Sequence, residues 1–163
     1  MNWYILALLA MFFSVWGYLG QTRHIKKQKS GQSVSIPYLV SDAVASLTKL
    51  IYGAARLDNI FILNALVCIF AQVATIYPLV KYKKLRTLEL VFFWAYVVLL
   101  GWMVVTVHKD VAIVAIGLLN GLAKTTQPVE LASEGKTGVL QIQMLVKHCV
   151  SVSIWTAYSW AFG

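Results

Sequence analysis

Two charged residues lie within an otherwise apolar run, and they are the residues of this sequence best placed to do chemistry. The segment SDAVASLTKLIYG, residues 41–53, contains Asp42 and Lys49. A full charge at bilayer depth costs roughly 2.5–3.5 kcal/mol even on the most lenient scale, so such residues mark candidate functional sites. Here the carboxylate can meet a cation, and the ammonium group can bind an anionic or zwitterionic solute.

The spacing of the two charges predicts that they share one face of a helix. They are seven residues apart, which places them about 10 Å apart along the axis, too far to pair directly. The small residues Ala45 and Ser46 lie between them, as suits a water-filled or protein-lined cavity. The alternative is structural: the charges pair with another helix, or Lys49 extends its ammonium group towards the outer surface.

Composition indicates what must surround these charges. The chain of 163 residues is 60% hydrophobic and only 12% charged, against about 25% charged in soluble domains. This is too little polar surface to face water. We therefore predict an all-α integral membrane protein, because backbone groups that face lipid must bond within their own segment. The alternating polarity of a transmembrane barrel is not found in the sequence.

Apolar runs near the ~18–20 residues that span a bilayer predict six transmembrane helices. Their predicted bounds are residues 2–21, 36–53, 60–80, 88–107, 111–126 and 139–162. The first shows almost no polar face before Gln21. The third carries a polar stripe at i, i+4, i+8 and i+11, formed by Asn64, Cys68, Gln72 and Thr75. We expect Cys68 and Cys149 to be small buried side chains rather than a disulfide.

The net charge of +8 is concentrated in two loops. The loops after the first and third helices each carry +4, those after the second and fourth are neutral, and the loop after the fifth carries −1. Short basic loops stay in the cytoplasm, so we expect the N-terminus outside. This explains the charge better than nucleic-acid binding, and we expect no nucleic-acid partner. Contact with membrane lipid head groups is the other reading of these loops.

An internal repeat organises the chain. GYLGQTRHIKKQKSGQSVSI and GLAKTTQPVELASEGKTGVLQI each predict a helix that ends near a glutamine, Gln21 or Gln127, followed by a polar loop and a new helix. We therefore predict a first triple-helix bundle over 1–80, a linker helix over 81–110 and a partial second bundle over 111–163, as parallel repeats.

Aligning the second helices of the two units relates the charged residues to the C-terminal segment. Lys49 falls on Trp155, and Asp42 falls on His148, beside Lys147. The alignment predicts that Lys147 or His148 supplies the cation that meets Asp42.

Several motifs resemble the SWEET / SemiSWEET / PQ-loop (MtN3/saliva) membrane transporter family. YLGQTRHIKKQKSGQS resembles its Pro-Gln segment, LIYGAARLD the end of its second helix, and ILNALV its third helix. The resemblance covers roughly residues 5–80 and, more faintly, 111–163. It implies transport of a small polar solute, a sugar or an amino-acid-like molecule, by alternating access. It implies no cofactor, and the sequence shows no metal-ligand cluster.

The resemblance and the repeat together give the expected site. The substrate-binding candidates are Asp42, Lys49, Asn64, His148, Ser151 and Trp155, and the gate candidates are Tyr52, Arg56, Asp58 and Tyr158. Lys49 stands where the family has a sugar-stacking tryptophan, which only the second unit keeps, as Trp155. The alternatives are that His148 packs, that Trp155 anchors at the interface, and that Arg56 and Asp58 belong to a solvated turn.

These observations lead to a membrane transporter as the expected function. The alternative is a non-transporting subunit that binds a partner protein in a larger complex, and a receptor with Lys49 as a carboxylate anchor is third. The family has seven helices where six are predicted here. Either the chain is cut short, or a homo-oligomer or membrane partner supplies the missing helix, or the protein does not transport. We expect no enzyme, since the sequence has no phosphate loop, no paired carboxylates and no nucleophile with a base.

Overall fold

The computed structural model is helical throughout its regular secondary structure in the part of the chain that it describes. It describes residues 3–32, 34–134, 146–147, 149–151 and 153–154. Five helices follow one another: α1 (Trp3–Gln28), α2 (Ile36–Arg56), α3 (Asn59–Tyr82), α4 (Thr87–Val105) and α5 (Lys109–Glu134). The all-α prediction is confirmed over these residues. Most of the sixth predicted helix lies outside them, and the described pieces of 146–154 are helical.

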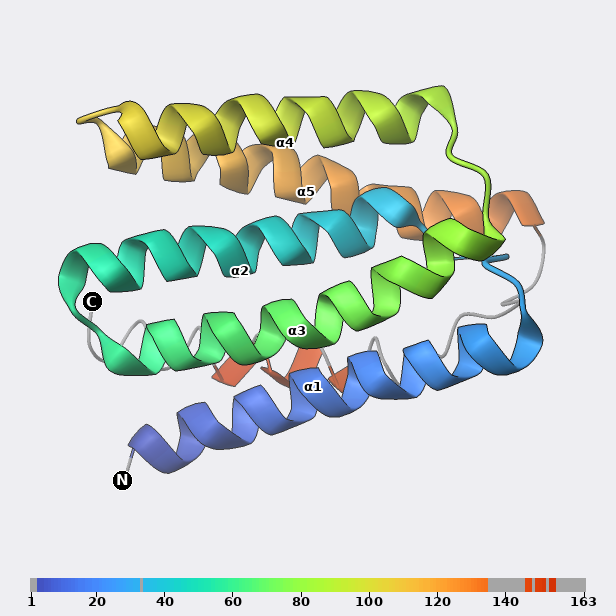
Figure 1. Cartoon of the computed structure of the whole chain (residues 1–163), viewed down its shortest axis with the longest axis horizontal. Coiled ribbons are helices and arrows are strands. Elements are labelled where there is room, and N and C mark those ends of the chain that lie inside the picture. Colours follow the sequence, from blue (N-terminus) through green and yellow to red (C-terminus); the bar gives the residue numbers. More distant parts are fainter. Residues whose placement is uncertain (1–2, 33, 135–145, 148, 152, 155–163) are drawn as a thin grey trace.

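Successive helices run in opposite directions and lie roughly parallel to the long axis of the molecule (Figure 1). Helix α3 packs against both α1 and α2, and α2 also packs against α4 and α5, which contact each other. Helix α2, which carries Asp42 and Lys49, therefore has neighbours on both sides, and polar groups on its two faces can meet other helices rather than lipid.

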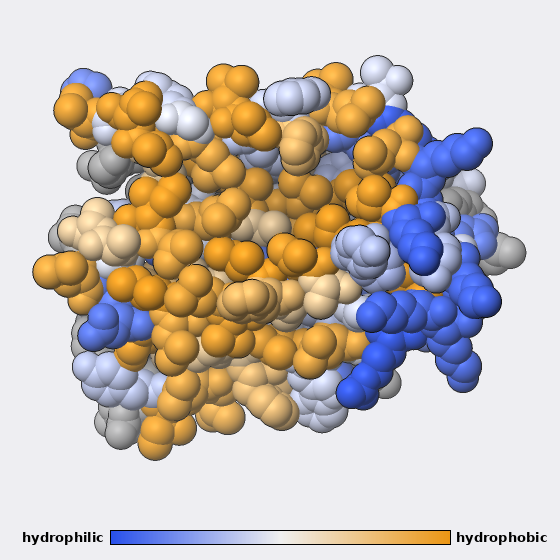
Figure 2. Space-filling model, in the orientation of Figure 1, coloured by the Kyte–Doolittle hydropathy of each residue, from blue (hydrophilic) through white to orange (hydrophobic). Residues whose placement is uncertain are grey.

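The outer surface suits a membrane. Three helices are long and apolar enough to cross a bilayer, over Tyr4–Gln28, Asn59–Tyr82 and Thr87–Val105. Helix α4 exposes a broad apolar face that includes Val91, Trp94, Val98 and Val105. In Figure 2 the hydrophobic surface occupies the middle of the molecule, and the hydrophilic surface gathers mainly at one end. These features give the chain the character of an integral membrane protein.

Two helices are longer than the sequence predicts. Helix α1 continues past Gln21 to Gln28, because lysine is a good helix former, and it ends where Lys29 takes a left-handed φ of 48°. Helix α5 continues through Pro128 to Glu134, although proline removes one helical hydrogen bond. The turns beyond Pro128 are held from outside the helix: Glu130 bonds Lys83, and Leu131 packs on the core.

Close approaches fix the two turns on either side of α2. A Cβ on Gly53 would lie 2.9 Å from the Cβ of Phe61, so glycine lets the start of α3 fold back against α2. A Cβ on Gly31 would lie 2.6 Å from Cδ1 of Leu79, which brings the α1–α2 link onto the end of α3. Ser35 then caps α2 by accepting a hydrogen bond from the Tyr38 backbone N–H.

Candidate functional site

A band of polar side chains runs through the interior between α1, α2, α3 and α5, and we call it the polar seam. Most of its side chains are buried, and all lie on helices whose outer faces are apolar. Its members are Ser14, Tyr18, Thr22, Asp42, Ser46, Asn64, Gln72, Thr75, Asn120 and Lys124. Because buried polar groups are costly unless hydrogen-bonded, the partners of each member indicate what the seam can do.

Asp42 is the charged centre of the seam. Its residue surface is only 3% exposed. Tyr18 of α1 donates a hydrogen bond of 2.5 Å from its hydroxyl to Oδ2, and Nζ of Lys124 in α5 lies 3.5 Å from Oδ1. One carboxylate on α2 therefore joins side chains of helices on both sides of it.

The backbone around Asp42 and Tyr18 is also held by polar side chains. Ser46 donates 3.1 Å and Gln72 donates 3.2 Å to the carbonyl oxygen of Asp42. Thr22 and Thr75 lie 2.8 Å apart through their hydroxyls, and both can donate to the carbonyl oxygen of Tyr18. The seam thus binds α1, α2 and α3 together by side-chain hydrogen bonds in the interior.

Two acceptor atoms of the seam have no hydrogen-bond partner in the part of the chain that the structure describes. They are Oε1 of Gln72 and Oδ1 of Asn120, both buried. The Gln72 amide nitrogen already donates to Asp42, which fixes which atom of that amide is the acceptor. Asn120 lies one helical turn before Lys124 on α5. Buried acceptors are rarely left unsatisfied, so these atoms are suited to a donor that comes from outside the chain.

The structure places several predicted site residues in or near the seam. Asp42 and Asn64 are buried there, and Asn64 donates to Sγ of Cys68 over 3.7 Å. Lys49 is half-buried, two turns further along α2. Ser151 is buried and accepts a hydrogen bond of 2.7 Å from Ser14. The predicted polar stripe of α3 is confirmed as an inward face, because Asn64, Cys68, Gln72 and Thr75 are all buried.

Other predictions for the C-terminal segment are corrected or untested. Among the described residues, Lys124 of α5 supplies a cation at Asp42. Lys147, one of the two cations that the repeat alignment offers there, instead has its Nζ 4.0 Å from the ring centre of Trp16, and the other, His148, is not tested. Cys149 is exposed, so the expectation that it is buried is wrong, while Cys68 is buried as expected. The predicted site residues His148 and Trp155 lie outside the described residues.

The predicted gate stays a prediction. Asp58 accepts hydrogen bonds at Oδ1 from the backbone N–H groups of Ile60 (3.0 Å) and Phe61 (3.1 Å), so it caps α3. Tyr52 is half-buried near the end of α2. The side chain of Arg56 and the whole of Tyr158 lie outside the description, so the structure does not test a pairing across the two units.

Sequence reasoning missed five members of the seam, namely Ser14, Tyr18, Thr22, Asn120 and Lys124. Ser14, Tyr18 and Thr22 lie at i, i+4 and i+8 of α1 and are all buried, so these few polar side chains of the helix share its inward face. The spacing was visible, but the aromatic ring of Tyr18 makes it count as apolar. Lys124 was also detectable, as a single cation within the predicted fifth helix.

A second charged cluster lies at the end of the bundle, and we call it the ionic clamp. Lys83 and Arg86, from the α3–α4 link, approach the two oxygens of Glu130 in α5 at 2.6 Å and 3.3 Å. Glu89 lies 3.8 Å from Lys83 and accepts a 2.8 Å hydrogen bond from the Arg86 backbone N–H. The clamp therefore joins the start of α4 to the last turns of α5.

The same end collects both basic segments of the chain. Nζ of Lys83 donates 2.7 Å to the carbonyl oxygen of Val34 in the α1–α2 link. In the same link, the Ser35 backbone N–H donates 2.9 Å to Gln127 of α5. Figure 2 shows the hydrophilic surface gathered there. We call it the basic end, formed by the segments 23–29 and 81–86.

Comparison with known proteins adds no family to this description. No model of a protein family matches the chain, and neither a curated protein nor a solved structure does. Within the described residues, no group of three or more His, Cys, Asp or Glu side chains could hold a metal ion. The seam, the clamp and the surface of this chain are therefore the features that bear on its function.

Proposed function

We propose that this chain is a membrane transporter of the SWEET/PQ-loop type that moves a small polar solute by alternating access, with the polar seam as its solute site. The observation that carries the proposal is the pair between Asp42 of α2 and Lys124 of α5. Charged residues inside a membrane-spanning bundle mark substrate or ion pathways by default. This pair joins the two predicted units, between which repeat-built transporters hold their solute.

The way in which Asp42 is paired would allow a solute to replace Lys124 beside the carboxylate. The 3.5 Å separation from Lys124 is longer than the roughly 2.7–2.9 Å of a strong charge-assisted hydrogen bond. The Lys124 side chain is 42% exposed, so packing does not lock it against Asp42 and it has room to turn away. A solute that brings hydroxyl or ammonium donors could replace it and also satisfy the free acceptors of Gln72 and Asn120.

The ionic clamp supplies a closed end for such a cycle. Glu130 ties the last turns of α5 to Lys83 and Arg86, and Lys83 also binds the α1–α2 link. A solute that leaves the seam towards the basic end requires α5 to move away from that link. The clamp would then break and re-form once in each cycle.

The test is uptake of labelled sugars and amino acids into liposomes that contain the purified protein. We expect Asp42→Asn and Lys124→Gln each to reduce uptake roughly tenfold or more, equivalent to about 1.4 kcal/mol of lost interaction. Thr125→Ala is the matched control, because the Thr125 hydroxyl is exposed and, among the described residues, bonds the carbonyl oxygen of Leu122 in its own helix. This variant should transport like the wild type.

The proposal fails if the wild-type protein moves no member of either solute class faster than protein-free liposomes. A companion protein that co-purifies at a fixed ratio in mild detergent would then favour the partner-binding subunit. Uptake that is equal in wild type, Asp42→Asn and Lys124→Gln would retain transport but remove the seam as its site.

A further inference from the structure

Two grooves open on the outer surface of the bundle, and they share one construction. Each is lined by apolar and aromatic side chains of a single helix and includes one cation towards the basic end. The first, of about 300 Å³, is lined by Phe12, Val15, Trp16, Leu19, Gly20 and Arg23 of α1. The second, of about 470 Å³, is lined by Val73, Ile76, Tyr77, Val80 and Lys81 of α3.

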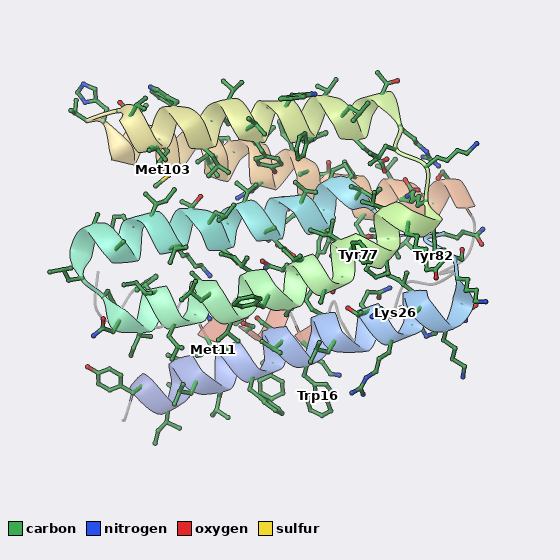
Figure 3. All side chains as sticks on the ribbon, viewed as in Figure 1. Met11, Trp16, Lys26, Tyr77, Tyr82 and Met103 are labelled. Carbon is green, nitrogen blue, oxygen red and sulfur yellow. The ribbon has the colours of Figure 1, made fainter. Side chains whose placement is uncertain are left out.

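A glycine helps to make the first groove. Trp16, Gly20 and Arg23 lie at i, i+4 and i+7, on one face of α1, and the missing side chain of Gly20 leaves a hollow between the other two. Trp16 is 51% exposed, and Lys147 packs over its ring. Figure 3 shows Trp16 on the outside of α1. The groove thus has a fixed aromatic wall and a guanidinium group one turn beyond the hollow.

The second groove repeats this order on α3. Tyr77 is 73% exposed, and Lys81 follows one turn later. Nζ of Lys81 lies 5.7 Å from the ring centre of Tyr82, at the end of the helix marked in Figure 3. An aromatic residue and then a cation therefore lie along the surface in the same direction as in α1.

The charge around the grooves is of one sign. Residues 21–32 and 79–86 contain seven lysines and arginines beyond Lys83, and no acid. Glu89 and Glu130, the acids that pair with cations at this end, are buried in the ionic clamp. The ends of both grooves therefore attract anions, while their walls remain apolar.

We propose that the two grooves bind anionic phospholipid, with the lipid phosphate at Arg23 or Lys81 and an acyl chain along the aromatic wall. A guanidinium group holds phosphate oxygens through paired hydrogen bonds, and an ammonium group holds them as a point charge. Clustered cations beside spanning helices attract anionic lipids. A soluble anion would leave the apolar walls unused, whereas a lipid uses both parts. The inference requires a bundle embedded in a membrane and does not require transport.

The experiment counts lipids that stay bound to the intact, detergent-purified protein in native mass spectrometry. The probes are phosphatidylglycerol and phosphatidylcholine with identical acyl chains. We expect roughly tenfold tighter retention of phosphatidylglycerol, and a loss of about one retained lipid for each of Arg23→Gln and Lys81→Gln. Lys84→Gln removes one charge from the same end outside both grooves and should retain the wild-type number.

Gly20→Leu separates shape from charge. It fills the first groove without removing a cation, and leucine is favoured over glycine in a helix interior, so this variant should fold. We expect it to lose about as much phosphatidylglycerol as Arg23→Gln. Three results would each overturn the proposal. The protein could retain the two lipids equally, Lys84→Gln could lose as much lipid as Arg23→Gln, or Gly20→Leu could have no effect. Displacement of the lipid by an equal concentration of inorganic phosphate would also overturn it, because it would indicate a soluble-anion site.

Discussion

The polar seam and the ionic clamp both hold buried charge, but they are built differently. In the clamp, Glu130 receives two cations, at 2.6 Å and 3.3 Å, and Lys83 also binds a backbone carbonyl. In the seam, Asp42 has a close phenol and a half-exposed lysine at 3.5 Å. The clamp is close to fully paired, whereas the seam keeps two buried acceptors unsatisfied among the described residues.

This difference separates a structural task from a solute-binding task. A fully paired charge cluster contributes most when every partner is present, because removing one member leaves another charge buried and uncompensated. A partly paired cluster has room for a ligand to complete it. We therefore expect variants of the clamp to affect stability most, and variants of the seam to affect uptake more than stability.

The largest loss of stability is expected for Lys83→Met. The Lys83 side chain is only 10% exposed, and its removal leaves Glu89 and Glu130 with Arg86 as their nearby cation and frees the carbonyl oxygen of Val34. The free energy of unfolding should fall by roughly 3–5 kcal/mol, measured by chemical unfolding in detergent.

The control for this variant is Lys84→Met, which removes the neighbouring, exposed charge. It should change the free energy of unfolding by less than about 0.5 kcal/mol. If Lys83→Met is no less stable than this control, the clamp is not structural, and the contrast with the seam fails.

A smaller loss is expected for Tyr18→Phe. The change removes only the hydroxyl that donates 2.5 Å to Asp42, and a hydrogen bond to a charged group is worth roughly 1.5–3 kcal/mol. The same unfolding measurement applies, with Tyr4→Phe as the control, because Tyr4 is 65% exposed. Wild-type stability in Tyr18→Phe would mean that the phenol does not support the buried carboxylate.

The smallest change in stability is expected for the two charges of α2. Asp42→Asn should cost about 1 kcal/mol, because the amide oxygen can still accept the hydrogen bond from Tyr18 and Lys124 is 42% exposed rather than buried with it. Lys49→Met should cost less and should impair solute binding more than stability. If Lys49→Met is the less stable of the two, and Asp42→Asn unfolds like the wild type, Lys49 is the structural charge and Asp42 is not.

The parts of the fold and site that the sequence predicts depend on spacing along one helix. The polar stripe from Asn64 to Thr75 and the bounds of α2 to within a turn follow from periodicity, and the structure agrees. Prediction from periodicity fails where a side chain is both apolar and polar, as for Tyr18 with its aromatic ring and hydroxyl. It also fails where tertiary contacts extend a helix, as Glu130 and Leu131 do beyond Pro128.

Spacing along one helix does not predict which residue of another helix pairs with Asp42. The sequence predicts that Asp42 meets a cation, because an unpaired carboxylate in an apolar bundle is expensive. It does not determine which helix supplies that cation, since the repeat alignment gives only a level along the axis. The alignment therefore offers Lys147 or His148, while packing of α2 against α5 brings in Lys124.

The native thiol of Cys68 offers the most direct test that the seam opens to water. Cys68 is buried on the seam face of α3, and Cys149, the other cysteine, is exposed, so Cys149→Ser leaves one probe. Only a hydrated thiolate reacts readily with a charged, membrane-impermeant thiosulfonate reagent. In sealed vesicles, alternating access predicts that Cys68 is modified when the reagent is added from either side, and more slowly when a transported solute is present. The account is contradicted if the reagent modifies Cys68 in the denatured chain but does not modify it in the folded protein from either side of the vesicle membrane.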